Sequence, residues 1–217
     1  MARQADLIFA QACAIETGED LRAHFADPPP QPDPQGFPAI AAGTGPMSPR
    51  GTMSDMFVAT IAAARDTISI TTPYFAPDPA LSAAIVAAAR RGVDVRIVFP
   101  QRSDSRVVGA ISRAYYPILA EAGVRIFEFL GGLLHAKTMV VDDRLAMIGS
   151  SNMDRRSLDL NYENNVLMES RDLAAQIRAR QDRWLANAVE VDRESARNRA
   201  LWRRFADNLL TMVAPVF

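Results

Sequence analysis

Short β-branched segments alternate with longer helical segments from residue 53 onward, and this alternation restricts the fold more than any other feature. Strands are expected at residues 67–72, 94–99, 124–129 and 165–168, and helices at residues 53–65, 79–91, 105–122 and 172–188. Strands that alternate with helices usually build one sheet with helices on its faces. The sequence therefore predicts an α/β sandwich with a mostly parallel sheet.

A hairpin is expected in the middle of this pattern. Residues 137–141 and 145–148 are short apolar runs around an Asp142-Asp143 turn. Neighbouring strands joined by so short a turn pair antiparallel. The sheet is therefore predicted to be mixed.

The first 44 residues differ in composition from the rest of the chain. Residues 1–26 carry apolar side chains near one helical face, and residues 26–51 are rich in proline and glycine. Such a stretch indicates a linker or an irregular surface segment. We expect a helix and linker over residues 1–44 and one compact domain over residues 45–217.

Charge and cysteine content exclude several classes of protein. The 217 residues include 24 basic and 25 acidic side chains, so the chain lacks the basic excess typical of nucleic-acid-binding proteins. Cys13 is the single cysteine, which excludes an internal disulfide and a Cys-rich metal site and favours a cytoplasmic setting. No apolar run reaches the roughly 18–20 residues that span a bilayer. Binding at a membrane surface remains open.

A histidine and a lysine stand two residues apart where the hairpin begins. In an extended segment, His135 and Lys137 point to the same face. The nearby ammonium group disfavours imidazolium, so we expect it to lower the pKa of His135 and to leave a neutral, nucleophilic imidazole. Lys137 is the only lysine in the chain, and its compact charge would attract an anionic substrate.

Polar side chains recur at the end of the next strand. Ser150 and Asn152 lie two residues apart, and Glu163 follows where it can accept a hydrogen bond from the imidazole of His135. A nucleophile, a cation and uncharged donors at one sheet end form a phosphate-binding set. An isolated histidine at a strand end is usually a surface or structural residue. Here the fixed offsets of its polar neighbours favour the functional interpretation.

The pattern H-x-K-x4-D-x6-G-S-x-N resembles the HKD motif of the phospholipase D superfamily. The stretches TPYFAPD (72–78), AARRGVDVRIVFPQRSD (88–104) and GSSNMDRRSLDLNYE (149–163) are similar to the C-terminal half of bacterial cardiolipin synthases. This resemblance implies a phospholipase D-like α/β/α sandwich, one of the usual two halves. Residues 1–44 would then be a remnant of the first half.

The same resemblance implies a two-step transfer. His135 would attack the phosphodiester phosphorus and form a phosphohistidine, while Lys137 and Asn152 hold the non-bridging oxygens with help from Ser150. A lipid alcohol or water would then accept the phosphatidyl group. With phosphatidylglycerol as substrate, the product would be cardiolipin. No metal and no organic cofactor are implied.

Other residues receive supporting roles from the resemblance. Glu163 would orient His135, and Asp142 would be a structural or orienting residue of the catalytic motif. Contacts to substrate are expected from five further residues: Gly149, Ser151, Tyr74, Phe75 and Arg156. Ordinary packing is an equal alternative for Tyr74 and Phe75, and an ion pair for Arg156.

The superfamily site normally combines two HKD motifs, and the second histidine is the general acid. The only other histidine here, His24, has no lysine two residues later. The site would therefore be completed in trans by a homodimer or by a complementary first-half domain. The alternatives are a hydrolase or nuclease of the same superfamily and an inactive truncated half.

The expected partner is anionic phospholipid, and the neutral charge disfavours nucleic acid. We expect peripheral contact with the cytoplasmic side of the inner membrane. An arginine-rich helix over residues 194–212 would lie on anionic lipid or dock on the domain.

Overall fold

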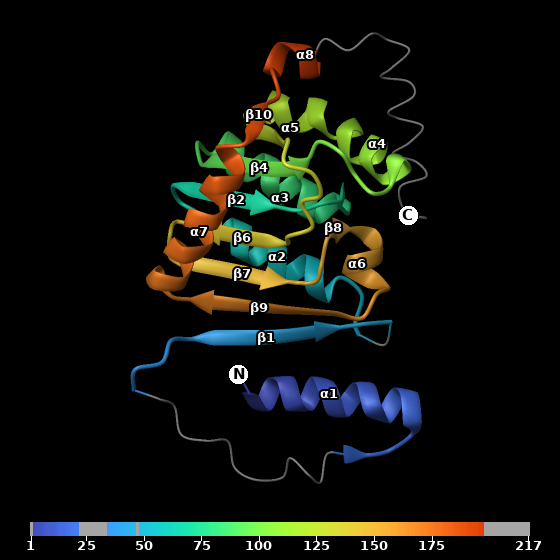
Figure 1. Cartoon of the computed structure of the whole chain (residues 1–217). Helices are drawn as coiled ribbons and strands as arrows, with labels where there is room; N and C mark the ends of the chain where they lie inside the picture. The colour runs from blue at the N-terminus through green and yellow to red at the C-terminus, as the bar shows by residue number, and fades with distance from the viewer. Residues whose placement is uncertain (1, 22–33, 47, 198–217) are drawn as a thin grey trace.

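An eight-stranded sheet with the order β1-β9-β7-β6-β2-β4-β5-β10 forms the centre of the computed structural model (Figure 1). Residues 2–21, 34–46 and 48–197 are described, so His24 and almost all of the expected arginine-rich helix lie outside the described residues. The strands of the sheet are β1 (Ala39–Thr44), β2 (Thr67–Thr71), β4 (Asp94–Pro100), β5 (Arg125–Phe129), β6 (Thr138–Val141), β7 (Leu145–Gly149), β9 (Glu163–Glu169) and β10 (Ala188–Glu190). A second sheet pairs β3 (Phe75–Ala76) with β8 (Met153–Asp154).

Helices cover both faces of the sheet, as the sandwich prediction requires. They are α1 (Ala2–Thr17), α2 (Thr52–Ala62), α3 (Pro79–Arg90), α4 (Arg106–Ala114), α5 (Tyr116–Ala122), α6 (Arg155–Asp159), α7 (Arg171–Leu185) and α8 (Arg193–Arg197). Figure 1 shows α7 in front of the sheet and α2 and α3 behind it. None of the described helices is both long enough and apolar enough to cross a membrane.

Side-chain alternation along the strands divides the core between the two faces. Ile68 and Ile70 of β2 and Ile97 of β4 are fully buried with residues of α2, α3 and α5. Val140 of β6 and Val98 of β4 face the opposite side, where α7 packs. This period of two is the signature of strands that are buried on both faces.

The expected α/β sandwich and mixed sheet are confirmed, and the strand pairing adds detail. Within the large sheet, parallel pairing is confined to β2, β4 and β5. The short strands β3 and β8 of the second sheet also pair parallel. The neighbours β6, β7, β9 and β1 pair antiparallel, as does β10 with β5. The parallel share is smaller than the sequence suggests, because β1, β6, β7, β9 and β10 join the sheet through antiparallel neighbours, most of them distant in sequence.

Two local expectations need correction. Residues 39–44 were expected in an irregular linker but form β1, which pairs with β9, so the sheet begins ahead of the expected boundary at residue 45. The single helix expected over residues 105–122 is two helices that meet at Tyr115. Pro117 causes this break, since it has no N–H to donate to the carbonyl of Arg113 in a continuous helix.

Candidate active site

The strand directions in the sheet bring segments that are distant in sequence to one end. β2 runs toward this end, and β6 starts from it because the two strands are antiparallel. β7 finishes here and β9 starts here, since they also pair antiparallel. Residues just outside these strand ends therefore converge.

His135 and Lys137 lie in the extended segment immediately before β6. The Nζ of Lys137 donates a hydrogen bond to the carbonyl oxygen of His135 at 2.9 Å, and the imidazole itself is exposed. Burial lowers the pKa of Lys137, although the carboxylates of Glu163, Asp154 and Asp104 act in the opposite direction. The lysine is therefore a half-buried cation among three carboxylates.

Tyr74 contacts His135 through its ring and Asp104 through its hydroxyl. The two ring centroids lie 5.9 Å apart with an interplanar angle of 84°. The Tyr74 hydroxyl donates to Oδ1 of Asp104 at 2.6 Å. Burial, assisted by Asp104, raises the pKa of Tyr74 to about 12, and the tyrosine hydrogen bond lowers the pKa of Asp104. From the sequence, Asp104 lies just beyond a strand end, where loops often carry function, but a solvated loop is the simpler interpretation.

Glu163 has other hydrogen-bond partners than the expected imidazole. Ser150 Oγ donates to Oε2 of Glu163, and Asn161 Nδ2 donates to Oε1 at 3.2 Å. The backbone N–H of Asn164 donates to Ser150 Oγ at 2.9 Å. Among the described residues, the imidazole of His135 has no hydrogen-bond partner. Glu163 therefore fixes Ser150, and orientation of His135 by Glu163 stays a prediction.

Asn152 is positioned by Ser157, which is itself hydrogen-bonded to the buried carboxylate of Asp154. Asn152 Nδ2 donates to Ser157 Oγ at 3.1 Å, and Asp154 accepts the backbone N–H of Ser157 at 2.8 Å. Burial raises the pKa of Asp154. Asn152 Oδ1 is buried and has no partner within the described parts of the chain. The amide is thus fixed in place while part of its hydrogen-bonding capacity stays unused.

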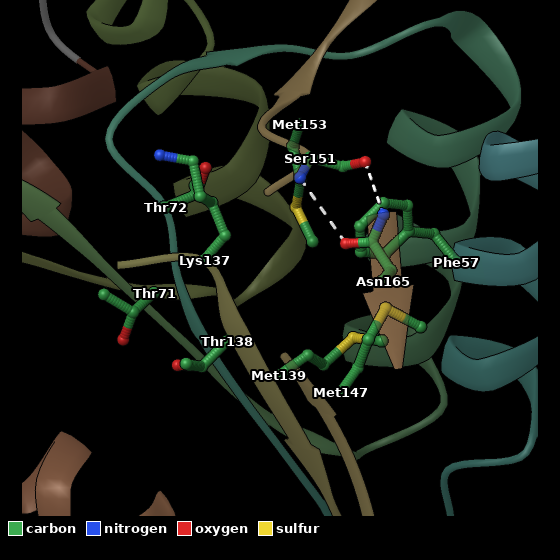
Figure 2. A pocket seen from close by; sticks show the side chains of 10 residues that line it. All are labelled: Phe57, Thr71, Thr72, Lys137, Thr138, Met139, Met147, Ser151, Met153 and Asn165. Atoms are coloured by element: carbon green, nitrogen blue, oxygen red, sulfur yellow. Dashed lines mark hydrogen bonds between the residues drawn. The ribbon is translucent and has the colours of Figure 1, made fainter. Parts of the chain in front are cut away.

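Gly149 ends β7 and is partly exposed, whereas Ser151 lies just beyond the strand and is buried, and contact of either with substrate stays a prediction. Ser151 is 1% exposed, and its Oγ accepts a hydrogen bond from Asn165 Nδ2 at 2.6 Å. Figure 2 shows this pair on one side of a small cavity and Lys137 with Thr72 on the other. A Cβ atom at Gly149 would lie 2.1 Å from Asn165 Oδ1, so only glycine fits there.

Two further expected contacts have different outcomes. Phe75 is 0% exposed and packs edge-on against Phe99 and Tyr115, so it belongs to the core and not to a headgroup cleft. Arg156 is exposed and lines an open hollow of about 390 Å³ together with Tyr74 and Asn152. Contact of Arg156 with substrate remains a prediction.

Asp142 lies at the opposite end of β6 from His135. Its carboxylate accepts backbone N–H groups of Arg65, Asp66 and Thr67, each at 2.9 Å. Burial alone would raise the pKa of Asp142, but these hydrogen bonds outweigh it and the pKa is lowered. Asp142 ties the hairpin turn to the start of β2, which is a structural role.

The family described as "Cardiolipin synthase, PLD-like domain" matches residues 57–184, which is more than half of the chain. The chain belongs to this family. Two cardiolipin synthase A proteins, from Yersinia pseudotuberculosis serotype O:1b and Escherichia coli O1:K1, are 35% identical to it over 100% of its length. The chain covers 45% of each of these relatives. The phospholipase D and cardiolipin synthase resemblance is thereby confirmed.

Solved structures confirm the phospholipase D-like fold of this family member. The phospholipase D family member Nuc from Salmonella typhimurium matches with a TM-score of 0.61 and 23% identity, over 71% of this chain and 97% of that one. Phosphatidylserine synthase from Haemophilus influenzae matches with a TM-score of 0.62 and 16% identity, over 82% of this chain and 47% of that one. At these identities the likeness concerns the fold.

A metal centre has no support in the described part of this phospholipase D-like domain. No group of three His, Cys, Asp or Glu side chains there is arranged to hold a metal ion. The polar groups that converge are an imidazole, one ammonium group, a hydroxyl, an amide and the carboxylates around Lys137. This set fits binding of a phosphate oxygen and attack on its phosphorus.

Proposed function

We propose that this domain transfers phosphatidyl groups from phosphatidylglycerol, as one half of a cardiolipin synthase-type site. The observation that carries the proposal is the convergence of His135, Lys137, Ser150 and Asn152 at one end of the sheet. The curated relatives are named cardiolipin synthase A, and their identity extends over 100% of this chain. Phosphatidylglycerol bears one phosphodiester, and Lys137 supplies a cation for its charge.

In the first step, the neutral imidazole of His135 attacks phosphorus and forms an N–P bond. The bond from phosphorus to the leaving glycerol oxygen breaks, and that oxygen takes a proton from a general acid. In the second step, an alcohol oxygen attacks phosphorus and loses its proton to the same group. The N–P bond then breaks, and free His135 is restored. Lys137 and Asn152 hold the non-bridging oxygens in both steps.

The general acid must come from outside this motif. The chain holds two histidines, and His24 lacks the lysine that would make a second motif. A second copy of the chain supplies another His135 through twofold symmetry. A complementary first-half domain would do the same, and the curated relatives are about twice as long as this chain. The protein would work at the cytoplasmic surface of the inner membrane, bound peripherally.

The test is turnover of phosphatidylglycerol vesicles by the purified chain without divalent metal. Cardiolipin and phosphatidate are followed by mass spectrometry, and His135→Asn and Arg65→Gln serve as catalytic and surface controls. We expect cardiolipin that disappears in His135→Asn and persists in Arg65→Gln, with a specific rate that rises with protein concentration if two copies complete the site.

Other outcomes separate the alternatives. Phosphatidate alone would identify a hydrolase and contradict phosphatidyl transfer to a lipid alcohol. Cleavage of plasmid DNA without lipid turnover would identify a nuclease. Absence of product from the chain alone, followed by product on addition of a first-half domain, would favour completion by a complementary half over a homodimer.

A further inference from the structure

A basic hollow lies at the start of α4, next to the loop that reaches the candidate active site. Its volume is about 490 Å³, and its lining residues are Gln101, Arg102, Ser103, Arg106, Gly109 and Arg113. Half of these residues are arginine and none is acidic. Because the whole chain has a formal net charge of −1, this concentration of positive charge is local.

The sequence of α4 keeps the hollow open. Arg106, Gly109 and Arg113 are three and four residues apart, so they share one helix face. A glycine inside a helix is less stable than alanine by about 1 kcal/mol. A Cβ atom at Gly109 would lie 3.0 Å from Cβ of Ser103 and 3.5 Å from Nη1 of Arg113. The absence of a side chain at this position therefore leaves room between the loop and the helix.

The guanidinium groups differ in how they are held. Arg113 is fixed by Glu128, with Nε at 3.2 Å from Oε1, and its Nη2 donates to the carbonyl oxygen of Gln101 at 2.6 Å. Arg102 and Arg106 are exposed. Among the described residues, neither has an ion-pair or hydrogen-bond partner for its guanidinium group. One anchored and two free guanidinium groups around a hollow suit an anion with several oxygens, such as phosphate.

The acidic residue in this loop, Asp104, accepts several hydrogen bonds, one of them from Oγ of Ser103, which lines the hollow, at 3.4 Å. Asp104 accepts hydrogen bonds from the Tyr74 hydroxyl at 2.6 Å and from the backbone N–H of Ser105 at 2.9 Å. Tyr74 in turn contacts His135. Asp104 therefore connects Ser103 at the hollow to Tyr74 at the catalytic end of the sheet, while Arg102 and Arg106 line the hollow itself.

We propose that this hollow binds the phosphate of an anionic lipid headgroup, in addition to the phosphodiester attacked at His135. The choice of a lipid rests on the proposed function. The hollow has no aromatic lining residue for base stacking, which disfavours single-stranded nucleic acid. Its charge and donors recognise phosphate, whether on a lipid or free in solution.

The test measures binding in the full chain carrying His135→Asn, so that no turnover interferes. Two double variants are compared. The hollow variant carries Arg102→Gln and Arg106→Gln, and the control variant carries Arg65→Gln and Arg171→Gln. The control pair removes the same charge at two exposed positions. Arg65 lies before β2 and Arg171 lies after β9, both at the end of the sheet away from the candidate active site. Binding to vesicles of phosphatidylglycerol and phosphatidylcholine is measured by sedimentation. We expect the hollow variant to bind about 30-fold more weakly and the control to change by less than about 3-fold.

Several results would overturn the proposal. Equal weakening by both pairs would mean that net charge matters and the hollow does not, and unchanged binding of the hollow variant would exclude the site directly. Loss of binding to a DNA oligonucleotide with unchanged vesicle binding would overturn the lipid assignment.

A parallel titration with sn-glycerol 3-phosphate and inorganic phosphate, followed by NMR shifts, identifies the source of the anion. Binding of these soluble anions that the hollow variant loses supports a general phosphate site. Loss of vesicle binding alone supports recognition at a lipid surface. None of these measurements requires catalysis, so failure of phosphatidylglycerol turnover in the unmodified chain remains a separate result.

Discussion

The HKD motif flanks β6, with His135 before the strand and Asp142 after it. The two residues differ in whether their polar side chains have hydrogen-bond partners. At the start of the strand, His135 is exposed and its imidazole has no hydrogen-bond partner among the described residues. At the other end, the carboxylate of Asp142 accepts three backbone N–H groups. A polar group without a hydrogen-bond partner in the protein is available to bind substrate. A polar group whose hydrogen bonds are all made within the protein stabilises the fold. The motif therefore joins a chemical function and a structural one across four residues of strand.

Replacement of the nucleophile should have the largest effect on activity. His135→Asn is expected to lower phosphatidyl transfer by on the order of 10⁴-fold or more, because no covalent intermediate can form. Since the side chain is exposed, the melting temperature should stay within about 1–2 °C of the unmodified protein. Retention of more than a hundredth of the activity would remove His135 from the reaction.

Replacement of Lys137 should have the next largest effect. Lys137→Met is expected to reduce kcat by about 10²–10³-fold, because it removes a cation from the phosphate oxygens. Lys137→Arg should recover little, since the planar guanidinium group differs in geometry from the compact ammonium group that donates to the His135 carbonyl.

The pH profile gives a second measurement for the same residue. The pKa of Lys137 is lowered by burial, so its charge is lost at a lower pH than that of an ordinary lysine. We expect the rate of the unmodified protein to fall on the alkaline side below the ordinary lysine pKa of about 10.4. A rate independent of pH up to that value would contradict the assigned charge.

Asp142 should change stability and leave the chemistry intact. Asp142→Ala is expected to destabilise the fold by about 1–2 kcal/mol, because three backbone N–H groups lose their acceptor. The left-handed backbone of this residue, with φ of 51°, adds to the cost in alanine. Asp142→Asn tolerates that backbone and is the matched control. Activity per folded molecule should stay within about 2-fold in both variants, and a larger loss would place Asp142 in the reaction.

The acid dependence of stability should distinguish Asp142 further. Its pKa is lower in the folded chain than in the unfolded chain, so the carboxylate stabilises the fold above the ordinary pKa of about 3.9. That contribution is lost as the pH falls through the folded-state pKa. Asp142→Asn is therefore expected to lose less stability than the unmodified chain over this acidic range, as followed by urea unfolding. An identical pH dependence would contradict the lowered pKa.

Removal of one hydroxyl at the catalytic end should reduce activity less than replacement of His135 or Lys137. Tyr74→Phe keeps the ring against His135 and removes the hydrogen bond to Asp104. We expect a reduction in kcat/KM of about 3- to 10-fold from this loss of positioning. Asp104→Asn should resemble Tyr74→Phe if the pair acts as a unit. Additive losses in the double variant would show that the two residues act independently.

The fold class and the convergence of the HKD-motif residues at one sheet end were predictable because they depend on local signals. Strand and helix periodicity predicted the α/β sandwich, and the fixed spacing of His135, Lys137 and Asn152 predicted one converging set. Residues 39–44 gave no such signal, since AIAAGT has weak strand propensity and forms β1 only through its partner β9.

The roles of individual side chains were harder to predict from the sequence, because burial depends on how the elements pack together. Phe75 and Ser151 stand beside reactive residues in sequence but point into the core. Tyr74 lies next to Phe75 and faces the other way, toward His135 and Asp104. The contact between Asp104 and Tyr74 was not predictable, because thirty residues separate the two in sequence.

The two borders of the large sheet are protected from aggregation by different means. β10 is three residues long, too short to template another strand efficiently. β1 is longer, and the backbone N–H of Ala41 is occupied by Oε1 of Gln4 from α1 at 3.1 Å. Helix α1 thus covers the edge strand β1. Removal of α1 would allow β1 to pair with β-strands of other molecules.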